Sequence, residues 1–339
     1  MMYRSWYPTC LLMLGMIACH SPERTENADN QSARNVDYGY ALDDTLRVNH
    51  IQAKGTHNSY HLRSPEPADA SHDYDQPTLT DQLARHGIRQ IELDVHYIAN
   101  EGYTVFHIPV FDELSHCRLF TDCLQELKTW SNANPGHHVL FVWIEIKDMI
   151  DADKIEDWDD FDAIIRTVWP EDRLLTPDDV QGEYPTIRDA LKQQGWPTLG
   201  QTRDHIMFML NNVERAEEYA HDGESLAGRV MFVNAGMDHD LTAIWKHGND
   251  AEQQAALDRG YLLGDNAAGA GSTVTEATAE VDAAWQRGVN FLATDFPAPL
   301  TAWSFEFTLP GGSPSRCNPK TAPANCAASD IEDLTRLHR

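Results

Sequence analysis

Short apolar runs alternate with amphipathic stretches along most of this chain. The runs have the length and the β-branched content of buried strands, and they predict strands at 50–57, 88–95, 103–107, 138–146, 205–211, 229–234, 260–264 and 289–295. The amphipathic stretches predict helices at 79–86, 122–132, 159–168, 187–194, 251–259 and 276–287. Strands that alternate with helices are typical of a parallel sheet, and eight strands close a barrel. The pattern therefore predicts an α/β fold, a (β/α)8 TIM-type barrel.

The first 19 residues have a different pattern. Arg4 precedes an apolar stretch from Cys10 to Ile17, which is the anatomy of an export signal. The stretch is shorter than the roughly 20 apolar residues of a membrane-spanning helix. Ile17-Ala18-Cys19 resembles the cleavage box of bacterial lipoproteins, in which Cys19 becomes lipidated. We expect an exported protein, anchored to a bacterial membrane in the periplasm or at the cell surface, with plain secretion as the alternative.

This signal sets the expected domain boundaries. Residues 1–19 are the signal peptide with its lipidation box, and the polar stretch 20–45 has the composition of a disordered tether. The catalytic barrel then extends over residues 46–310. Residues 311–339 form a C-terminal tail with a cysteine pair, and we expect this tail to pack on the outside of the barrel.

Export also changes how the cysteines are interpreted. Four cysteines remain after the signal, and they form two close pairs, Cys117 with Cys123 and Cys317 with Cys326. An even number of cysteines in an oxidising compartment indicates two disulfides, with four free thiols as the alternative. A zinc site is the weaker interpretation, because neither pair has the spacing of zinc ligands.

The charge of the chain is strongly acidic. The 339 residues include 26 Lys and Arg against 53 Asp and Glu, which gives a formal net charge of −27 at pH 7. This balance excludes a nucleic-acid-binding protein that relies on a basic face. The acidic stretch 148–162 lacks the glycine and the oxygen ligands of an EF-hand loop, so we interpret it as a solvated face or insertion. No feature indicates an obligate protein partner.

Unusual polar residues gather at the carboxyl ends of the predicted strands, which meet at one mouth of a β/α barrel. They are His57 and Asn58 after the first strand, Glu92, Asp94 and His96 on the second, His107 after the third, Glu145 and Lys147 on the fourth, and Asp295 after the eighth. Crowded carboxylates repel one another unless a cation lies between them. The three carboxylates and the Asn58 amide oxygen form a hard oxygen site, which suits Ca²⁺ and, as the less favoured alternative, Mg²⁺.

The two strand-end histidines predict acid/base chemistry. His57 and His107 can face each other across the mouth, and a histidine pair beside a divalent cation is suited to cleavage of a phosphodiester. The eighth strand of a closed barrel neighbours the first, so Asp295 could orient His57. Each of these residues also has a structural alternative. Each histidine alone could be a hydrogen-bonded structural residue, and the Glu-x-Asp pair could lie on a solvent-facing edge strand. Asp295 could cap the following turn.

Four segments carry a family resemblance: GTHNSY (55–60), IELDVH (91–96), FH (106–107) and WIEIKD (143–148). In this order and spacing they resemble the catalytic half of calcium-dependent phosphoinositide-specific phospholipases C. The similarity is greatest to the single-domain bacterial branch, in which a cysteine pair follows the second histidine. It extends over roughly residues 46–300 and weakens after residue 150.

The resemblance implies a PLC-like phosphodiesterase barrel with a bound calcium ion. The implied calcium ligands are Asn58, Glu92, Asp94 and Glu145. The resemblance also implies that His57 stabilises the transition state and that His107 is the general acid. The family reaction is attack of the inositol 2-hydroxyl on the adjacent phosphate, which yields diacylglycerol and a cyclic phosphate. Lys147 and His96 are candidates for contacts with the substrate, with surface exposure as the alternative for Lys147.

One departure leaves the substrate open. Members of this bacterial branch carry arginines at the seventh strand, whereas this chain has YLLGDN at 261–266. We therefore expect a phospholipid or a soluble phosphodiester as the substrate, and the sequence does not identify its headgroup. One alternative function is a calcium-binding barrel that recognises a polyol, a glycan or a lipid headgroup without turnover. A glycerophosphodiester phosphodiesterase is another alternative, although these relatives usually show His-Arg-Gly where this chain has Gly-Thr-His-Asn-Ser.

Overall fold

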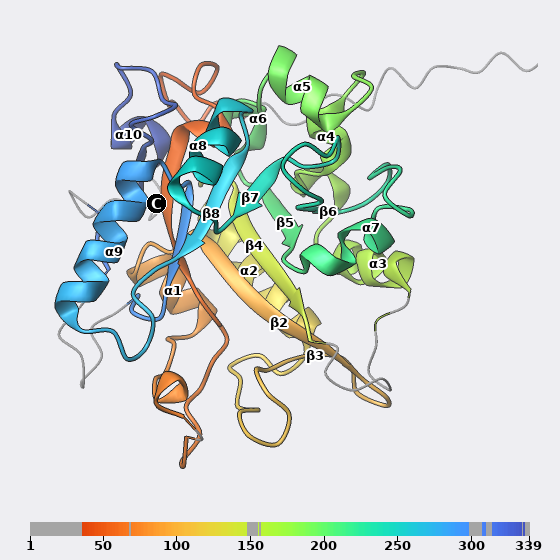
Figure 1. Cartoon of the computed structure of the whole chain (residues 1–339), viewed down its shortest axis with the longest axis vertical. Helices are drawn as coiled ribbons and strands as arrows, with labels where there is room; N and C mark the ends of the chain where they lie inside the picture. Colours follow the sequence, from red (N-terminus) through yellow and green to blue (C-terminus); the bar gives the residue numbers. More distant parts are fainter. Residues whose placement is uncertain are drawn as a thin grey trace, which may run out of the picture. The chain divides into compact units, whose positions relative to one another are not determined.

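Eight parallel strands form a nearly closed barrel (Figure 1). The strands are β1 (Ile51–Thr56), β2 (Gln90–Ile98), β4 (Leu140–Ile146), β5 (Ile206–Leu210), β6 (Met231–Phe232), β7 (Ile244–Lys246), β8 (Leu262–Asn266) and β9 (Phe291–Thr294). They lie side by side in the order β6-β5-β4-β2-β1-β9-β8-β7. Among the described residues, a single bridge between Val233 and Thr242 links the two ends of this order. The predicted α/β barrel is therefore confirmed.

The structure is a computed structural model that describes residues 36–67, 69–147, 155, 157–297, 307–309, 314–333 and 335. The predicted signal peptide, its lipidation residue Cys19 and the first part of the predicted tether lie outside the described residues. Within the described part of the chain, no helix has both the length and the apolar character needed to cross a membrane.

All six helices that the amphipathic pattern predicts are present. They are α1 (Leu79–Arg85), α2 (Phe120–Ala133), α3 (Trp158–Val168), α5 (Ile187–Gln193), α8 (Asp250–Asp258) and α9 (Val274–Arg287). Five of the six begin at an N-cap whose side chain accepts a hydrogen bond from the first turn, namely Thr78, Asp157, Thr186, Asn249 and Thr273. The shorter helices α4 (Pro177–Gln181), α6 (Leu199–Thr202), α7 (Ala216–Tyr219) and α10 (Ala328–Ile331) were not predicted, because four or five residues carry too little periodicity.

The prediction of a barrel strand at 103–107 was wrong. Strand β3 (Gly102–Val105) pairs antiparallel with β2, with Val105 opposite Val95 and Gly102 opposite Ile98. The chain reverses within three residues, too few for the crossover that a parallel strand needs. The eighth position of the barrel belongs instead to β7, whose three residues are too short to show a strand pattern.

Parallel register stacks the inward-facing side chains of the barrel in layers. Phe141 of β4 lies beside Gln90 of β2, and its ring stacks on Phe291 of β9 at 4.4 Å. One layer higher, Trp143 fills the interior, and a Cβ on Gly264 would lie 2.2 Å from its ring. Glycine at this position of β8 therefore allows the tryptophan to pack across the barrel. On β2, Glu92 already lies beside Trp143, and the next inward positions of β2 and β4 carry Asp94 and Glu145.

The folded unit begins earlier than the predicted boundary at residue 46. Tyr40 is buried under the guanidinium of Arg203, 3.8 Å from its ring centroid, and Asp43 forms an ion pair of 2.6 Å with the same arginine. Residues 36–45 therefore contact the barrel and do not belong to the predicted tether. The polar composition of 20–45 did not reveal this, because the few residues that make these contacts show no periodic pattern.

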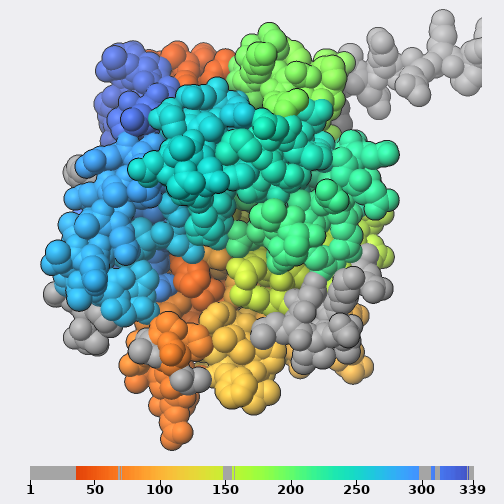
Figure 2. All heavy atoms as spheres, in the orientation of Figure 1, coloured from red at the N-terminus to blue at the C-terminus, as the bar shows by residue number. Residues whose placement is uncertain are grey.

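The C-terminal tail contributes both a strand and a disulfide. Strand β10 (Ser315–Cys317) pairs antiparallel with β1, and Asn318 donates a backbone hydrogen bond to His50. Figure 2 shows this blue C-terminal segment beside the red residues at the start of the described chain. The Cys317–Cys326 and Cys117–Cys123 disulfides are both present, as predicted.

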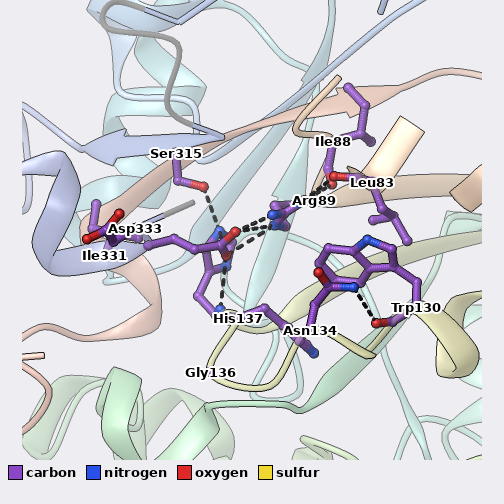
Figure 3. Close-up of polar contacts among 12 residues, drawn as sticks. Leu83, Ile88, Arg89, Trp130, Asn134, Gly136, His137, Ser315, Ile331 and Asp333 are labelled. Atoms are coloured by element: carbon purple, nitrogen blue, oxygen red, sulfur yellow. Dashed lines mark hydrogen bonds and ion pairs between the residues drawn. The ribbon is translucent and has the colours of Figure 1, made fainter. Parts of the chain in front are cut away.

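The tail also places the buried carboxylate of Glu332 at the floor of the barrel, the end formed by the amino termini of the strands. The prediction that the tail packs only on the outside did not include this residue. Arg89 and Glu332 are both fully buried and form an ion pair at the amino-terminal ends of β2 and β4. Arg89 also donates hydrogen bonds to the carbonyls of Leu83 and Ile88 (Figure 3). His138 Nε2 lies 2.5 Å from Ser315 Oγ. Burial opposes ionisation of Glu332, but Arg89 outweighs it and lowers the pKa of Glu332 to about 2.

We predict that Glu332→Gln destabilises the protein by about 3–5 kcal/mol, because it leaves the Arg89 charge buried without its partner. Urea unfolding followed by tryptophan fluorescence measures this change. The matched control is Glu171→Gln, which breaks a solvent-exposed pair with Arg166 and should cost less than about 1 kcal/mol. Equal effects of the two substitutions would contradict the role of the tail in closing the barrel floor.

Candidate functional site

Three carboxylates meet at the carboxyl ends of β2 and β4. Parallel register places Asp94 directly beside Glu145, and Glu92 lies one inward position below Asp94. One oxygen from each of the three groups lies within 4.8 Å of the others. Asp94 and Glu92 are buried, with Glu145 partly exposed toward the mouth. The strand pattern thus brings together the three acids that the sequence predicted as metal ligands.

Two lysines lie against this carboxylate cluster. Lys147 Nζ is 3.1 Å from Asp94 Oδ2 and also contacts Glu145. Lys246 Nζ lies 3.5 Å from Glu92 Oε1 and 3.8 Å from the centroid of the Trp143 ring. Both ammonium groups therefore offset part of the negative charge.

The pKa values of the cluster reflect both its burial and its neighbouring charges. Burial raises the pKa of Asp94 to about 6, and the neighbouring Glu145 and Glu92 add to this rise while Lys147 opposes it. Burial would lower the pKa of Lys147, but Asp94 and Glu145 outweigh it and hold that pKa well above its ordinary value. Burial also opposes ionisation of Glu145, but Lys147 outweighs it and lowers the pKa of Glu145. Asp94 therefore stays harder to ionise than an ordinary aspartate even with the lysine in place.

Asn58 lies next to the carboxylate cluster in the loop that follows β1. Its backbone has a φ of 42°, a left-handed conformation that asparagine adopts more readily than most residues. The following residue, Ser59, donates its backbone N–H to the Glu92 carbonyl at 3.1 Å, and its hydroxyl accepts from the Glu92 N–H at 2.8 Å. The Tyr60 hydroxyl donates to Asn58 Oδ1 at 3.3 Å. These contacts hold the buried amide beside β2.

His57 is held by the carboxylate of Asp295. The His57 Nδ1 atom lies 2.9 Å from Asp295 Oδ1, because β9 is the neighbour of β1 in the barrel. Burial alone would lower the pKa of His57, but Asp295, together with Glu92 and Asp94, raises it to about 9. His57 therefore carries a proton at neutral pH in the metal-free protein.

His107 reaches the same mouth by a different route. It follows the hairpin strand β3, and the N–H of the preceding Phe106 donates to the Asp94 carbonyl at 3.3 Å. His107 Nδ1 lies 2.9 Å from Asp112 Oδ2. Burial would raise the pKa of Asp112, but hydrogen bonds from His107 and His61 hold it well below its usual range. His107 is thus a second histidine oriented by a carboxylate.

His96 lies in an internal contact of the β2–β3 hairpin. Its ring stacks on Phe106 with centroids 3.8 Å apart, and its Nε2 donates to the Phe106 carbonyl at 3.0 Å. Burial lowers the pKa of His96. The hairpin uses this histidine in an internal contact, and its predicted contact with substrate stays a prediction.

Sequence reasoning missed three residues of this site. Asp112 lies five residues after His107 in a tight turn, in which Val110 has a φ of 70°. Asn211, at the end of β5, donates to Glu145 Oε2 at 3.1 Å. Lys246 belongs to the three-residue strand β7. A polar residue after a predicted strand could have indicated Asn211, whereas nothing local distinguishes Asp112 or Lys246 from surface residues.

The chemistry of the carboxylate cluster fits calcium. All its donor atoms are oxygens, and Glu92 Oε2 is buried without a hydrogen-bond partner among the described residues. Hard oxygen ligands of this kind suit Ca²⁺ or Mg²⁺, whereas zinc prefers nitrogen and sulfur. A cation among the three acids would also relieve their mutual repulsion.

The comparisons with known proteins agree with this chemistry. The family model of Ca²⁺-dependent phosphoinositide phospholipase C matches residues 96–319, about two thirds of the chain. No curated protein matches the chain significantly in sequence.

Solved structures show the same fold. A Ca²⁺-dependent phosphatidylinositol-specific phospholipase C from Streptomyces antibioticus has a TM-score of 0.56 at 20% identity, covering 74% of this chain and 95% of that chain. A calcium-dependent phosphoinositol-specific phospholipase C from the Gram-negative bacterium Pseudomonas sp. has a TM-score of 0.57 at 18% identity, covering 82% of this chain and 97% of that chain. With the family model, these likenesses lead to one conclusion: the chain belongs to the Ca²⁺-dependent phosphoinositide phospholipase C family, whose members are phosphodiesterases.

Proposed function

We propose that this protein is an exported Ca²⁺-dependent phosphodiesterase that cleaves a phosphoinositide-type headgroup by internal attack of a ring hydroxyl and releases a cyclic phosphate. The observation that supports this proposal most strongly is the carboxylate cluster of Glu92, Asp94 and Glu145 at the mouth of the barrel. Two histidines lie near this cluster, and each is oriented by a carboxylate of its own. This arrangement combines a hard cation site, carboxylates that would accept the proton of the attacking hydroxyl, and two histidines that would act on the phosphodiester oxygens.

Glu92, Asp94, Glu145 and the Asn58 amide are the proposed calcium ligands. When bound, the ion lowers the pKa of the attacking hydroxyl and offsets the phosphate charge. Lys147 now occupies part of this space through its contacts with Asp94 and Glu145. Its four-carbon side chain can turn toward the substrate phosphate once the carboxylates have another cation, so we retain Lys147 as a substrate-binding residue.

His57 is proposed to stabilise the transition state. Its protonated ring, held at Nδ1 by Asp295, can donate from Nε2 to the phosphate oxygen that gains negative charge. Because Asp295 fixes the ring orientation before the substrate arrives, no reorganisation is needed during the reaction. Asp295 is thus a positioning residue.

His107 is proposed as the general acid. Its Nδ1–H is held by Asp112, which leaves Nε2–H free to protonate the departing alkoxide oxygen of the lipid or alcohol. The carboxylate of Asp112 also stabilises the charged imidazolium before proton transfer. The two histidines therefore act on different oxygens of the same phosphodiester.

The basic residues near the mouth bear on the class of substrate. Segment 261–266 carries no arginine, and Asp265 of β8 forms an ion pair of 3.2 Å with Arg287. The basic groups against the carboxylate cluster are Lys147 and Lys246, so the proposed contacts with the substrate phosphate use lysines in place of arginines.

The two disulfides fit an oxidising compartment, which supports export. Lipid anchoring through Cys19 remains part of the proposal.

The experiment that tests this function is phosphorus NMR of the protein incubated with phosphatidylinositol, glycerophosphoinositol and phosphatidylcholine. We expect a cyclic phosphate from an inositol substrate, loss of turnover with a chelator, and recovery with added calcium. Activity that survives chelation would contradict the calcium assignment and would favour Lys147 and Lys246 as the compensating charges.

A matched pair of substitutions compares a carboxylate of the cluster with an exposed acid outside it. Asp94→Asn removes one charge from the cluster and should weaken calcium binding, measured by calorimetry, on the order of tenfold or more. Glu214→Gln alters an exposed acid after β5 and should leave calcium affinity unchanged. Binding without any turnover on the panel would favour a headgroup-recognition barrel over an enzyme.

We predict that His107→Ala lowers kcat by about 10²- to 10⁴-fold, because the leaving oxygen loses its proton donor. The loss should shrink strongly for a substrate with a phenolic leaving group of low pKa, which departs without protonation. Stopped-flow or steady-state kinetics with both substrates make the comparison. A loss that is equal for the two leaving groups would remove His107 from the acid role.

We predict that Asp295→Asn lowers the pKa of His57 from about 9 toward its ordinary value of about 6.5, because Asp295 is the largest of the attractions that raise this pKa. Carbon-detected NMR titration of His57 in calcium-free protein measures the shift. Asp265→Asn, which removes a carboxylate paired with the exposed His247, is the control and should leave the His57 titration in place.

A further inference from the structure

A second cluster of ligating side chains lies beside the carboxylate cluster, in the loops that extend from the mouth. His61, His72 and His107 all turn a ring nitrogen toward the carboxylate of Asp112. The loops that carry them lie side by side at the lower edge of Figure 2, and His61 pairs with Ser115 in an isolated bridge. Three imidazoles around one carboxylate exceed what the orientation of His107 requires.

The spacing of these atoms fits a tetrahedral metal ion. His107 Nδ1 lies 2.9 Å and His72 Nδ1 lies 3.7 Å from the same oxygen, Asp112 Oδ2. Ligand atoms bound about 2.0–2.1 Å from a tetrahedral zinc ion lie about 3.3–3.4 Å from one another. The two observed distances fall on either side of this value, so small side-chain rotations produce a ligand set.

His72 has the unused ligand atom that a metal would occupy. Its Nδ1 is buried and makes no hydrogen bond to any residue that the structure describes. The side chains of His72 and His107 are 16% and 18% exposed, which leaves an ion a route from solvent, while Asp112 is buried beneath them. A buried nitrogen that makes no hydrogen bond among the described residues, yet lies 3.7 Å from a shared carboxylate oxygen, points to a ligand that is not part of the polypeptide.

His61 supports the carboxylate from behind. Its Nε2 lies 3.0 and 2.9 Å from the two oxygens of Asp112, and its Nδ1 lies 3.0 Å from the Tyr74 carbonyl. Oxygen atoms face both nitrogens, so His61 holds Asp112 as a hydrogen-bond donor. Carboxylate ligands of metals are commonly fixed by such outer hydrogen bonds.

We propose that His72, His107 and Asp112 form a second metal site, for a divalent transition ion of the zinc type, with water as the fourth ligand. Two imidazoles and one carboxylate are a zinc ligand set, in contrast to the all-oxygen cluster that suits calcium. The two sites therefore select different ions and can be loaded separately.

This site would regulate turnover, and this consequence rests on the proposed function of His107. A metal bound at Nδ1 replaces the proton that Asp112 holds there and leaves the ring with a single proton at Nε2. Loss of that proton would produce an imidazolate, so the ring no longer acts as a ready acid. Zinc at this site is expected to inhibit phosphodiester cleavage without displacing calcium.

The test is a zinc titration of the full-length protein, stripped of metals and then saturated with calcium, followed by calorimetry. We expect one equivalent of zinc to bind, and Co²⁺ in its place to give the visible absorption of a tetrahedral site. His72→Gln should weaken zinc binding at least tenfold, since even the outer-shell partners of metal sites are worth about 10- to 100-fold. His72→Cys should retain binding and add a sulfur-to-cobalt charge-transfer band.

The control is His221→Asn, which removes an exposed imidazole at a backbone φ of 50° that asparagine tolerates. This variant should bind zinc like the unmodified protein. Absence of zinc binding, or binding that His72→Gln leaves unchanged, would overturn the site. Zinc that binds through His72 yet leaves cleavage unaffected would support the site and contradict the acid role of His107, so the two failures are distinguishable.

Discussion

The mouth of this barrel depends on the repulsion between carboxylates that parallel register forces together. Asp94 and Glu145 are direct neighbours on β2 and β4, and Glu92 lies one inward position below. Neither strand can relieve the repulsion by shifting, because a slip of one residue would turn Phe141 and Trp143 out of the core. The protein therefore needs positive charge at this place. Lys147 and Lys246 supply part of it, and a calcium ion among oxygen ligands would supply the rest.

The same constraint organises the groups around the cluster. His57 carries its proton because Asp295 and the buried acids favour the charged ring. His107 is brought to Asp94 by the β2–β3 hairpin, and a tight turn then folds Asp112 back onto its ring. Each of the two histidines is thus paired with its own carboxylate. The zinc-type site that we infer shares one of these pairs, which would link metal availability to the state of the proposed acid.

At the opposite end of the barrel, a buried charge is also neutralised, but by another residue of the chain. Arg89 and Glu332 are buried together, so the C-terminal tail brings the compensating charge from a distant part of the chain. The burial of His138 and its contact with Ser315 attach the same tail to the start of β4. The floor is closed by a pair within the protein, whereas the mouth leaves its charge open to a ligand. This asymmetry matches the usual division of β/α barrels into a stabilising end and a functional end.

The local patterns of the sequence determined the six longer helices, seven of the eight barrel strands and the residues that meet at the mouth, since strand ends carry the unusual polar side chains. Sequence could not distinguish β3 from a barrel strand, because both show the same short apolar pattern and only the three-residue reversal decides the direction of pairing. It also could not place Asp112, Lys246 or Glu332, whose partners are recognised only after turns and distant segments come together. Periodicity thus determined which residues face the interior, and the tertiary structure decided which charges neutralise one another, because ion pairs depend on distances between segments that the local pattern does not encode.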